Sequence, residues 1–218
     1  FEAIRRTLLE DALTLQEGML SEEGDDPAVR REAAEAYNRL SAIQQLLGRQ
    51  EEALVSIEKA LAIREELLPD DPDNLLKRDN IALGHHDLGN VYRSVGRWED
   101  SERQFRRSIE LCEESIRRNP DQSPGFTVTL VRSLSDLAIT FEEQSRFEEA
   151  VALCRRAFEL IEPLAKLEQR NAGRLSQVAA ALQTQGPALT RLGRFDEALA
   201  SLDAAVPWRE RLVELLPK

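Results

Sequence analysis

The chain has 218 residues, of which 42% are hydrophobic, 32% charged and only 5% aromatic, a composition that favours a folded, helix-rich protein over a β-sandwich. Its formal net charge of −11 argues against general binding to nucleic acid or anionic membranes, because like charges repel. No window approaches 18 consecutive apolar residues and no signal-peptide pattern opens the sequence, so we expect no membrane contact and a cytoplasmic location.

Taken in chain order, the apolar periodicity predicts antiparallel helix pairs separated by segments rich in helix-breaking residues. The first 20 residues (1–20) are expected to be the second helix of a preceding repeat, because a shift of 48 residues places Ala12–Leu15 over Ala60–Ile63. Four helix pairs are predicted after it, at 28–69, 73–118, 125–168 and 172–216. Both ends read as cut through a repeat, so a longer native protein is the expectation.

Four short stretches look alike and start 48, 49 and 48 residues apart: Gly48–Ala53, Gly96–Ser101, Ser145–Ala150 and Gly193–Ala198. Each predicts a tight turn between two helices, with glycine ending one helix and an acidic pair in the first turn of the next. The small sixth residue lets two helices approach closely, and the aromatics Trp98, Phe147 and Phe195 can pack back on the preceding helix. Ser145 replaces glycine, so its turn must close differently or at some cost in strain.

Three prolines fall inside predicted helices. Pro163 and Pro207 lie late in second helices, where we expect a kink or an early end, and Pro187 should kink a first helix.

The second pair shows the repeated pattern most fully, as Leu88, Gly89, Tyr92, Gly96, Trp98, Ser101, Phe105 and Ser108. This pattern resembles the tetratricopeptide repeat family, which implies an all-α, right-handed α-α superhelix, a TPR-like solenoid. The period departs from the family's usual ~34 residues. The 48-residue period here adds about two helical turns to each helix of a pair, as in the elongated repeats of kinesin light chains and bacterial multidomain signalling proteins.

The sequence contains no motif typical of catalysis or metal binding. Phosphate-binding glycine loops and the zinc-protease and hydrolase motifs are missing from the sequence. His85 and His86 are neighbours that point about 100° apart on a helix and read as packed or solvated rather than as ligands. Cys112 and Cys154 fall on apolar stripes and read as core residues. No catalytic residue, metal or cofactor is predicted, and this chain is not expected to be an enzyme.

The resemblance implies instead that first-helix residues line a concave groove for a protein or peptide ligand. The positions of this sequence that are equivalent to the family's groove residues are Asn38, Gln45, His86, Asn90, Arg93, Arg132, Ser135, Glu142, Gln183 and Thr190. Asn90 stands where the family often places an asparagine that binds a peptide backbone. Arg93 and Arg132 could hold a carboxylate, or they could be solvated or paired with Glu142 and Asp136.

The family's carboxylate clamp for chaperone tails is a narrower test. Its Lys, Asn, Asn, Lys and Arg positions correspond here to Asn38, Ala42, Asp87, Arg132 and Asp136. Only Arg132 keeps the required charge, so chaperone-tail binding is disfavoured.

Three hypotheses follow. The first is a non-catalytic scaffold that binds a peptide or helix of a partner in the groove. The second is a regulatory region of a larger bacterial signalling protein, a Ser/Thr kinase or a transcriptional regulator, whose catalytic or DNA-binding domain lies outside these residues. The third is a homo-oligomer formed through the apolar end helices at 1–20 and 195–216.

Overall fold

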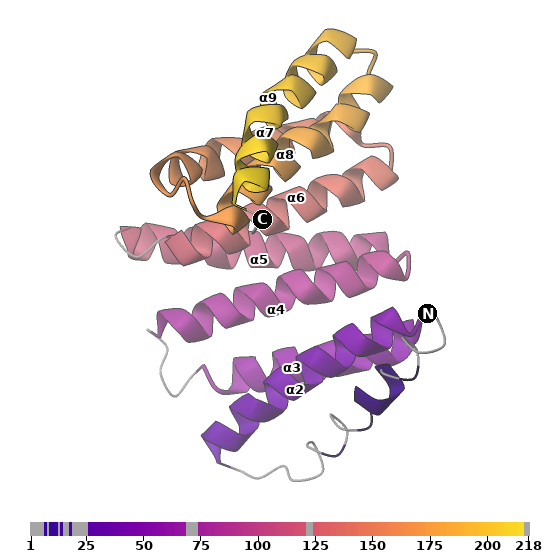
Figure 1. Cartoon of the computed structure of the whole chain (residues 1–218). Coiled ribbons are helices and arrows are strands. Elements are labelled where there is room, and N and C mark those ends of the chain that lie inside the picture. Colours follow the sequence, from indigo (N-terminus) through magenta and orange to yellow (C-terminus); the bar gives the residue numbers. More distant parts are fainter. Residues whose placement is uncertain are drawn as a thin grey trace. The chain divides into compact units, whose positions relative to one another are not determined.

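The computed structural model describes residues 26–68, 74–120 and 124–215, together with 7, 9–12, 14 and 18. Its helices, traced in Figure 1, are α2 (Pro27–Leu46), α3 (Gln50–Glu66), α4 (Leu75–Ser94), α5 (Trp98–Arg118), α6 (Pro124–Glu143), α7 (Phe147–Leu167), α8 (Ala172–Arg191) and α9 (Phe195–Glu214). No strand occurs among these residues, which confirms the all-α prediction. Most of the helix expected over 1–20 lies outside the described residues, although those described there are helical.

The chain divides into two compact units, Phe1–Gln104 and Phe105–Lys218. In the N-terminal unit, α3 packs against both α2 and α4. In the C-terminal unit, α7 packs against α6 and α8, and α9 packs against α8. In both units, therefore, a second helix packs against the first helix of its own pair and the first helix of the next pair.

All four turns between paired helices close in the same way. Gly48, Gly96 and Gly193 have φ of 75°, 73° and 73°, and Ser145 has φ of 61°. In each turn the next residue donates its N–H to a carbonyl five residues earlier, as Arg146 does to Phe141 at 2.8 Å. The Ser145 turn therefore is not closed differently. It adopts the left-handed conformation at the strain expected of a residue with a Cβ atom.

The small residues after the turns lie where two helices meet. Ala53, Ser101, Ala150 and Ala198 are all buried. Ser101 also donates its hydroxyl to the Gly89 carbonyl at 2.8 Å, which joins α5 to α4 across the turn. These contacts are the close approach that the repeated small position predicts.

The aromatic position behaves less uniformly than predicted. Trp98 and Phe147 are half-buried, but Phe195 is 64% exposed, so it does not pack back on α8. Phe147 differs because the Arg191 guanidinium of α8 lies over its ring, 5.5 Å from the centroid.

Of the two outcomes expected at Pro163 and Pro207, the early end is wrong, and the kinks expected there and at Pro187 stay predictions. Helix α7 continues past Pro163 to Leu167, and α9 continues past Pro207 to Glu214. Helix α8 likewise runs through Pro187 to Arg191. A proline removes one backbone N–H, and burial of the flanking Ile161 and Ala165 holds α7 together across that gap.

Candidate functional site

Three of the predicted groove residues, His86, Asn90 and Arg93, form a hydrogen-bonded chain with Asp87 along α4. His86 is only 2% exposed, deeper than a groove-lining side chain needs to be. Its Nδ1 lies 3.1 Å from Asp87 Oδ1, and its Nε2 lies 3.3 Å from the Asn90 amide nitrogen. Arg93 donates to Asn90 Oδ1 at 3.0 Å. A neutral imidazole protonated on Nδ1 satisfies both of its contacts, so the Asn90 side chain is oriented by its own helix.

Arg64 of α3 lies against α4, near Gly84 and Asp87. Burial lowers the pKa of its guanidinium, while Asp87 and Glu35 act in the opposite direction. A Cβ atom at Gly84 would lie 2.9 Å from Leu61 Cδ1 and 3.2 Å from Arg64 Nη1, so glycine is what lets this arginine pass over α4. Sequence reasoning missed Arg64 because only first-helix positions were considered.

The α2 residues of the predicted groove lie apart from that chain. Asn38 and Gln45 are both half-buried. Gln45 donates to the Ser41 carbonyl at 3.5 Å, and Asn38 Oδ1 is buried with no hydrogen-bond donor among the described residues.

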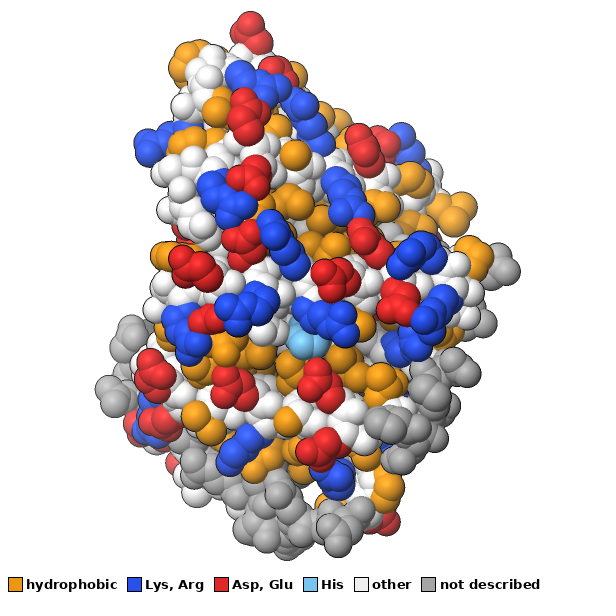
Figure 2. Space-filling model, turned by 180° about the vertical axis from the view of Figure 1, so that it is seen from behind, with side chains coloured by type: hydrophobic (Ala, Val, Ile, Leu, Met, Phe, Trp, Pro, Cys, Tyr) orange, Lys and Arg blue, Asp and Glu red, His pale blue; other side chains and the backbone are white. Residues whose placement is uncertain are grey.

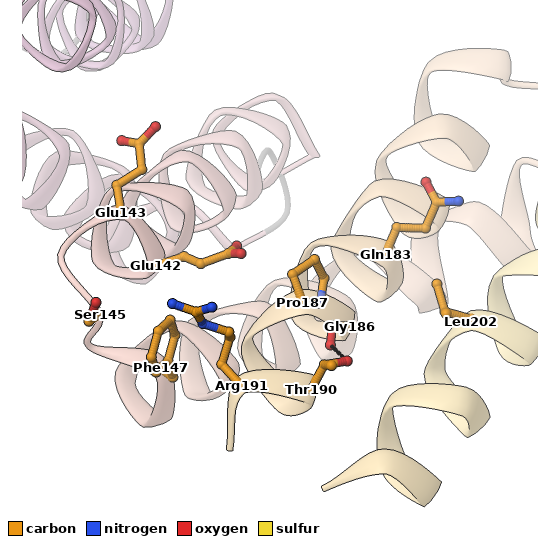
Figure 3. Close-up of a pocket in the computed structure, with 10 residues that line it drawn as sticks. All are labelled: Glu142, Glu143, Ser145, Phe147, Gln183, Gly186, Pro187, Thr190, Arg191 and Leu202. Carbon is orange, nitrogen blue, oxygen red and sulfur yellow. Dashed lines mark hydrogen bonds between the residues drawn. The ribbon is translucent and has the colours of Figure 1, made fainter. Parts of the chain in front are cut away.

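The C-terminal unit contains an open pocket of about 750 Å³, here named the α6–α8 pocket (Figure 3). It is lined by Glu142, Glu143, Ser145, Phe147, Gln183, Gly186, Pro187, Thr190, Arg191 and Leu202. Three of the predicted groove residues, Glu142, Gln183 and Thr190, therefore share one cavity. Arg132 and Ser135 lie earlier on α6 and do not line it.

Six of the ten residues that line the α6–α8 pocket are polar or charged, and Pro187 lies near the centre of the view in Figure 3. Figure 3 shows Glu142 reaching toward Arg191 and Pro187, whereas Glu143 points away from them. Burial raises the pKa of Glu142, and the nearby Glu143 raises it further, while Arg191 opposes both. Thr190 donates to the Gly186 carbonyl at 2.9 Å and so is committed to its own helix.

A family comparison now bears on this geometry. The tetratricopeptide repeat model matches residues 33–73, 86–119 and 130–162. The chain belongs to the tetratricopeptide repeat family.

Solved structures agree on the fold. BtubC (BKLC) from P. vanneervenii is 17% identical with a TM-score of 0.70, and the match covers 96% of this chain and 76% of that one. Aspartyl phosphate phosphatase F from Bacillus subtilis is 16% identical with a TM-score of 0.67, over 84% of this chain and 41% of that one. The kinesin light chain nearly identical TPR-like repeats from Podosopora anserina are 18% identical with a TM-score of 0.57, over 96% and 87%. Among curated protein sequences, none matches. The helix pairs thus form a TPR-like solenoid.

Part of the α6–α8 pocket lies beyond the residues that the repeat model matches. Its α8 and α9 side, with Pro187, Arg191 and Leu202, follows residue 162, although the 48-residue recurrence continues through it. The predicted groove contained first-helix residues only, and so it missed Phe147 and Leu202, which belong to the second helices α7 and α9. The available sequence signal was the place of Phe147 at the aromatic position of the repeated turn.

The surface of these repeats mixes charges of both signs. Figure 2 shows Lys and Arg side chains interspersed with Asp and Glu over one face. Many are paired within one helix, such as Arg107 with Glu110 at 3.3 Å. Among the described residues, none of the helices is long and apolar enough to cross a membrane, and no group of three His, Cys, Asp or Glu could hold a metal ion.

Proposed function

We propose that this tetratricopeptide repeat chain is a non-catalytic scaffold that binds a peptide or helix of a partner protein, and that the α6–α8 pocket is its main recognition site. The carrying observation is the pocket itself. It has about 750 Å³ of space, and the apolar side chains of Phe147, Pro187 and Leu202 line it together with six polar or charged residues. Ligand sites are typically concave, mostly apolar and furnished with a small number of oriented polar side chains.

Two features of the pocket support a peptide rather than a reaction. Leu202 keeps 44% of its surface exposed there, which leaves apolar area for a partner to cover. The nearby Cys154 is buried, and burial raises the pKa of its thiol to about 12, so at neutral pH it is not a thiolate nucleophile.

A pair of matched variants tests the scaffold proposal. Leu202→Arg places a charge in the pocket wall, whereas Val206→Arg makes the same change one turn later on α9, at a side chain that is 49% exposed and does not line the pocket. Partner capture by the wild type and by Val206→Arg should be similar, and Leu202→Arg should reduce it at least about tenfold. Equal capture by the two variants would place the recognition site elsewhere.

The polar chain on α4 remains a second predicted contact. Asn90→Ala combined with Arg93→Glu should weaken capture of the same partner without changing helicity or melting. Unchanged capture would remove the N-terminal unit from the binding surface.

Self-association is favoured by a separate observation. Along α9, an exposed apolar stripe is formed by Phe195, Leu199, Leu202, Val206 and Val213. A second copy could cover such a face, and sedimentation over a wide concentration range checks it. A monomer throughout that range would exclude it. The regulatory-region hypothesis stays a prediction, to be tested by whether the encoding gene carries a kinase or DNA-binding domain.

A further inference from the structure

We infer that the α6–α8 pocket selects a partner segment carrying a basic side chain, Lys or Arg, which pairs with Glu142, next to an apolar side chain that packs on Leu202 and Pro187. This inference rests on the proposed scaffold function and specifies the chemistry of its ligand.

The electrostatics of the pocket favour a cation. Its charged lining consists of Glu142, Glu143 and Arg191, which sum to −1. Helix α6 ends at Glu143 and α8 ends at Arg191, so the pocket lies by the C-terminal turns of two helices. The partial negative charge of a helix C-terminus stabilises a nearby cation.

Glu142 is the group that the cation would satisfy. Within the described part of the chain its carboxylate accepts no hydrogen bond and forms no ion pair, although it is half-buried. A carboxylate taken partly out of water is best stabilised by a charge-assisted hydrogen bond to Lys or Arg.

Arg191 does not fill that role. Its guanidinium lies over the Phe147 ring, 5.5 Å from the centroid, and Figure 3 shows it between that ring and Glu142. Among the described residues no ion pair joins it to Glu142, although its charge lowers the pKa of that carboxyl. An anionic ligand drawn to Arg191 would meet the nearby carboxylate of Glu142, so the arrangement disfavours it.

The apolar half of the pocket lies beside the charged half. Pro187 stands at the centre of the view in Figure 3, between Arg191 and Leu202. Gly186 presents no side chain, and a Cβ atom there would lie 3.6 Å from Leu202 Cδ2. An aliphatic or aromatic side chain therefore has both space and apolar surface within one or two residues of a cation held at Glu142.

Selection from random peptides tests the inference without a known partner. A phage library of random dodecapeptides is selected on the wild type and on two charge-reversal variants, Glu142→Lys and Glu159→Lys. Glu159 is exposed on α7 and does not line the pocket, so the second variant matches the change in net charge. Circular dichroism checks that both remain helical, and Glu142→Gln serves as a nearly isosteric third variant.

We expect wild type and Glu159→Lys to enrich peptides with Lys or Arg next to an apolar residue. Synthetic versions should bind Glu142→Lys at least about tenfold more weakly, and Glu142→Gln more weakly than the wild type. Enriched peptides without a basic residue, or ones that bind Glu142→Gln and wild type equally, would overturn the inference and leave the scaffold proposal standing. No enrichment on any variant would overturn both.

Discussion

The α6/α7 and α8/α9 hairpins repeat the same sequence pattern 48 residues apart. One face of the second helix is nevertheless buried in α7 and exposed in α9. On α7 the face is buried at Val151, Cys154, Ile161 and Ala165. The corresponding residues of α9 are all exposed: Leu199, Leu202, Arg209 and Val213. Three of these four remain apolar, so the difference does not come from the helix itself. It comes from α8, which packs on α7.

The opposite face is buried in both α7 and α9. Ala150 and Ala157 of α7 are buried, and so are Ala198 and Ala205 of α9. These alanines face the first helix of their own hairpin, which the repeat always supplies. One face of each second helix is thus buried within its own hairpin, and the other face is buried only where the next hairpin packs on it.

Truncating a side chain on the buried face of α7 should cost more unfolding free energy than truncating one on the exposed face of α9. Ile161→Ala should lower the free energy of unfolding by about 2–4 kcal/mol, because it leaves a cavity under α8 at a fully buried side chain. Leu202→Ala removes a side chain that is 44% exposed, and should cost less than about 1 kcal/mol. Urea denaturation of both variants measures the difference. Equal losses would mean that α9 is as well covered as α7.

The two hairpins also differ at the left-handed position of their turns, which is Ser145 in one and Gly193 in the other. Ser145→Gly in the α6/α7 turn should raise the free energy of unfolding by about 0.5–1 kcal/mol, because glycine adopts φ near 60° without a Cβ clash. Gly193→Ser in the α8/α9 turn should lower it by a similar amount, since φ there is 73°. Thermal melting of the single and double variants checks both signs. A stabilising Gly193→Ser would contradict the strain argument.

Much of this architecture could be predicted from the sequence because it depends on local chemistry. Glycines at a constant period mark the turns, and the acidic pairs fall in the first turns of α3, α5, α7 and α9. The continuation of α7 past Pro163 to Leu167 could not be predicted in this way, because tertiary packing is not a local property.

For the candidate site, the sequence predicted only the residues whose position follows from the repeat register. Repeat register placed Glu142 and Gln183 on first helices, and both line the α6–α8 pocket. It did not show that Arg209 of α9 donates to Gln183, or that Arg64 of α3 passes over Gly84. Such contacts depend on how long side chains cross between helices, which periodicity does not encode.

The smallest expected effect concerns Glu142, whose counterpart one repeat later is the uncharged Thr190. Burial raises the pKa of the Glu142 carboxyl, so its folded-state pKa lies above its unfolded one. The resulting penalty is absent below about pH 4 and is fully present above the folded pKa. Glu142→Gln should therefore stabilise the chain at pH 7 by at most about 0.5 kcal/mol, since solvent screens a half-buried group, and the gain should vanish at pH 4. Urea midpoints at the two pH values, with Glu159→Gln as the control, measure this. A gain of equal size at both pH values would show that the amide acts through packing and not through the charge of the α6 carboxylate.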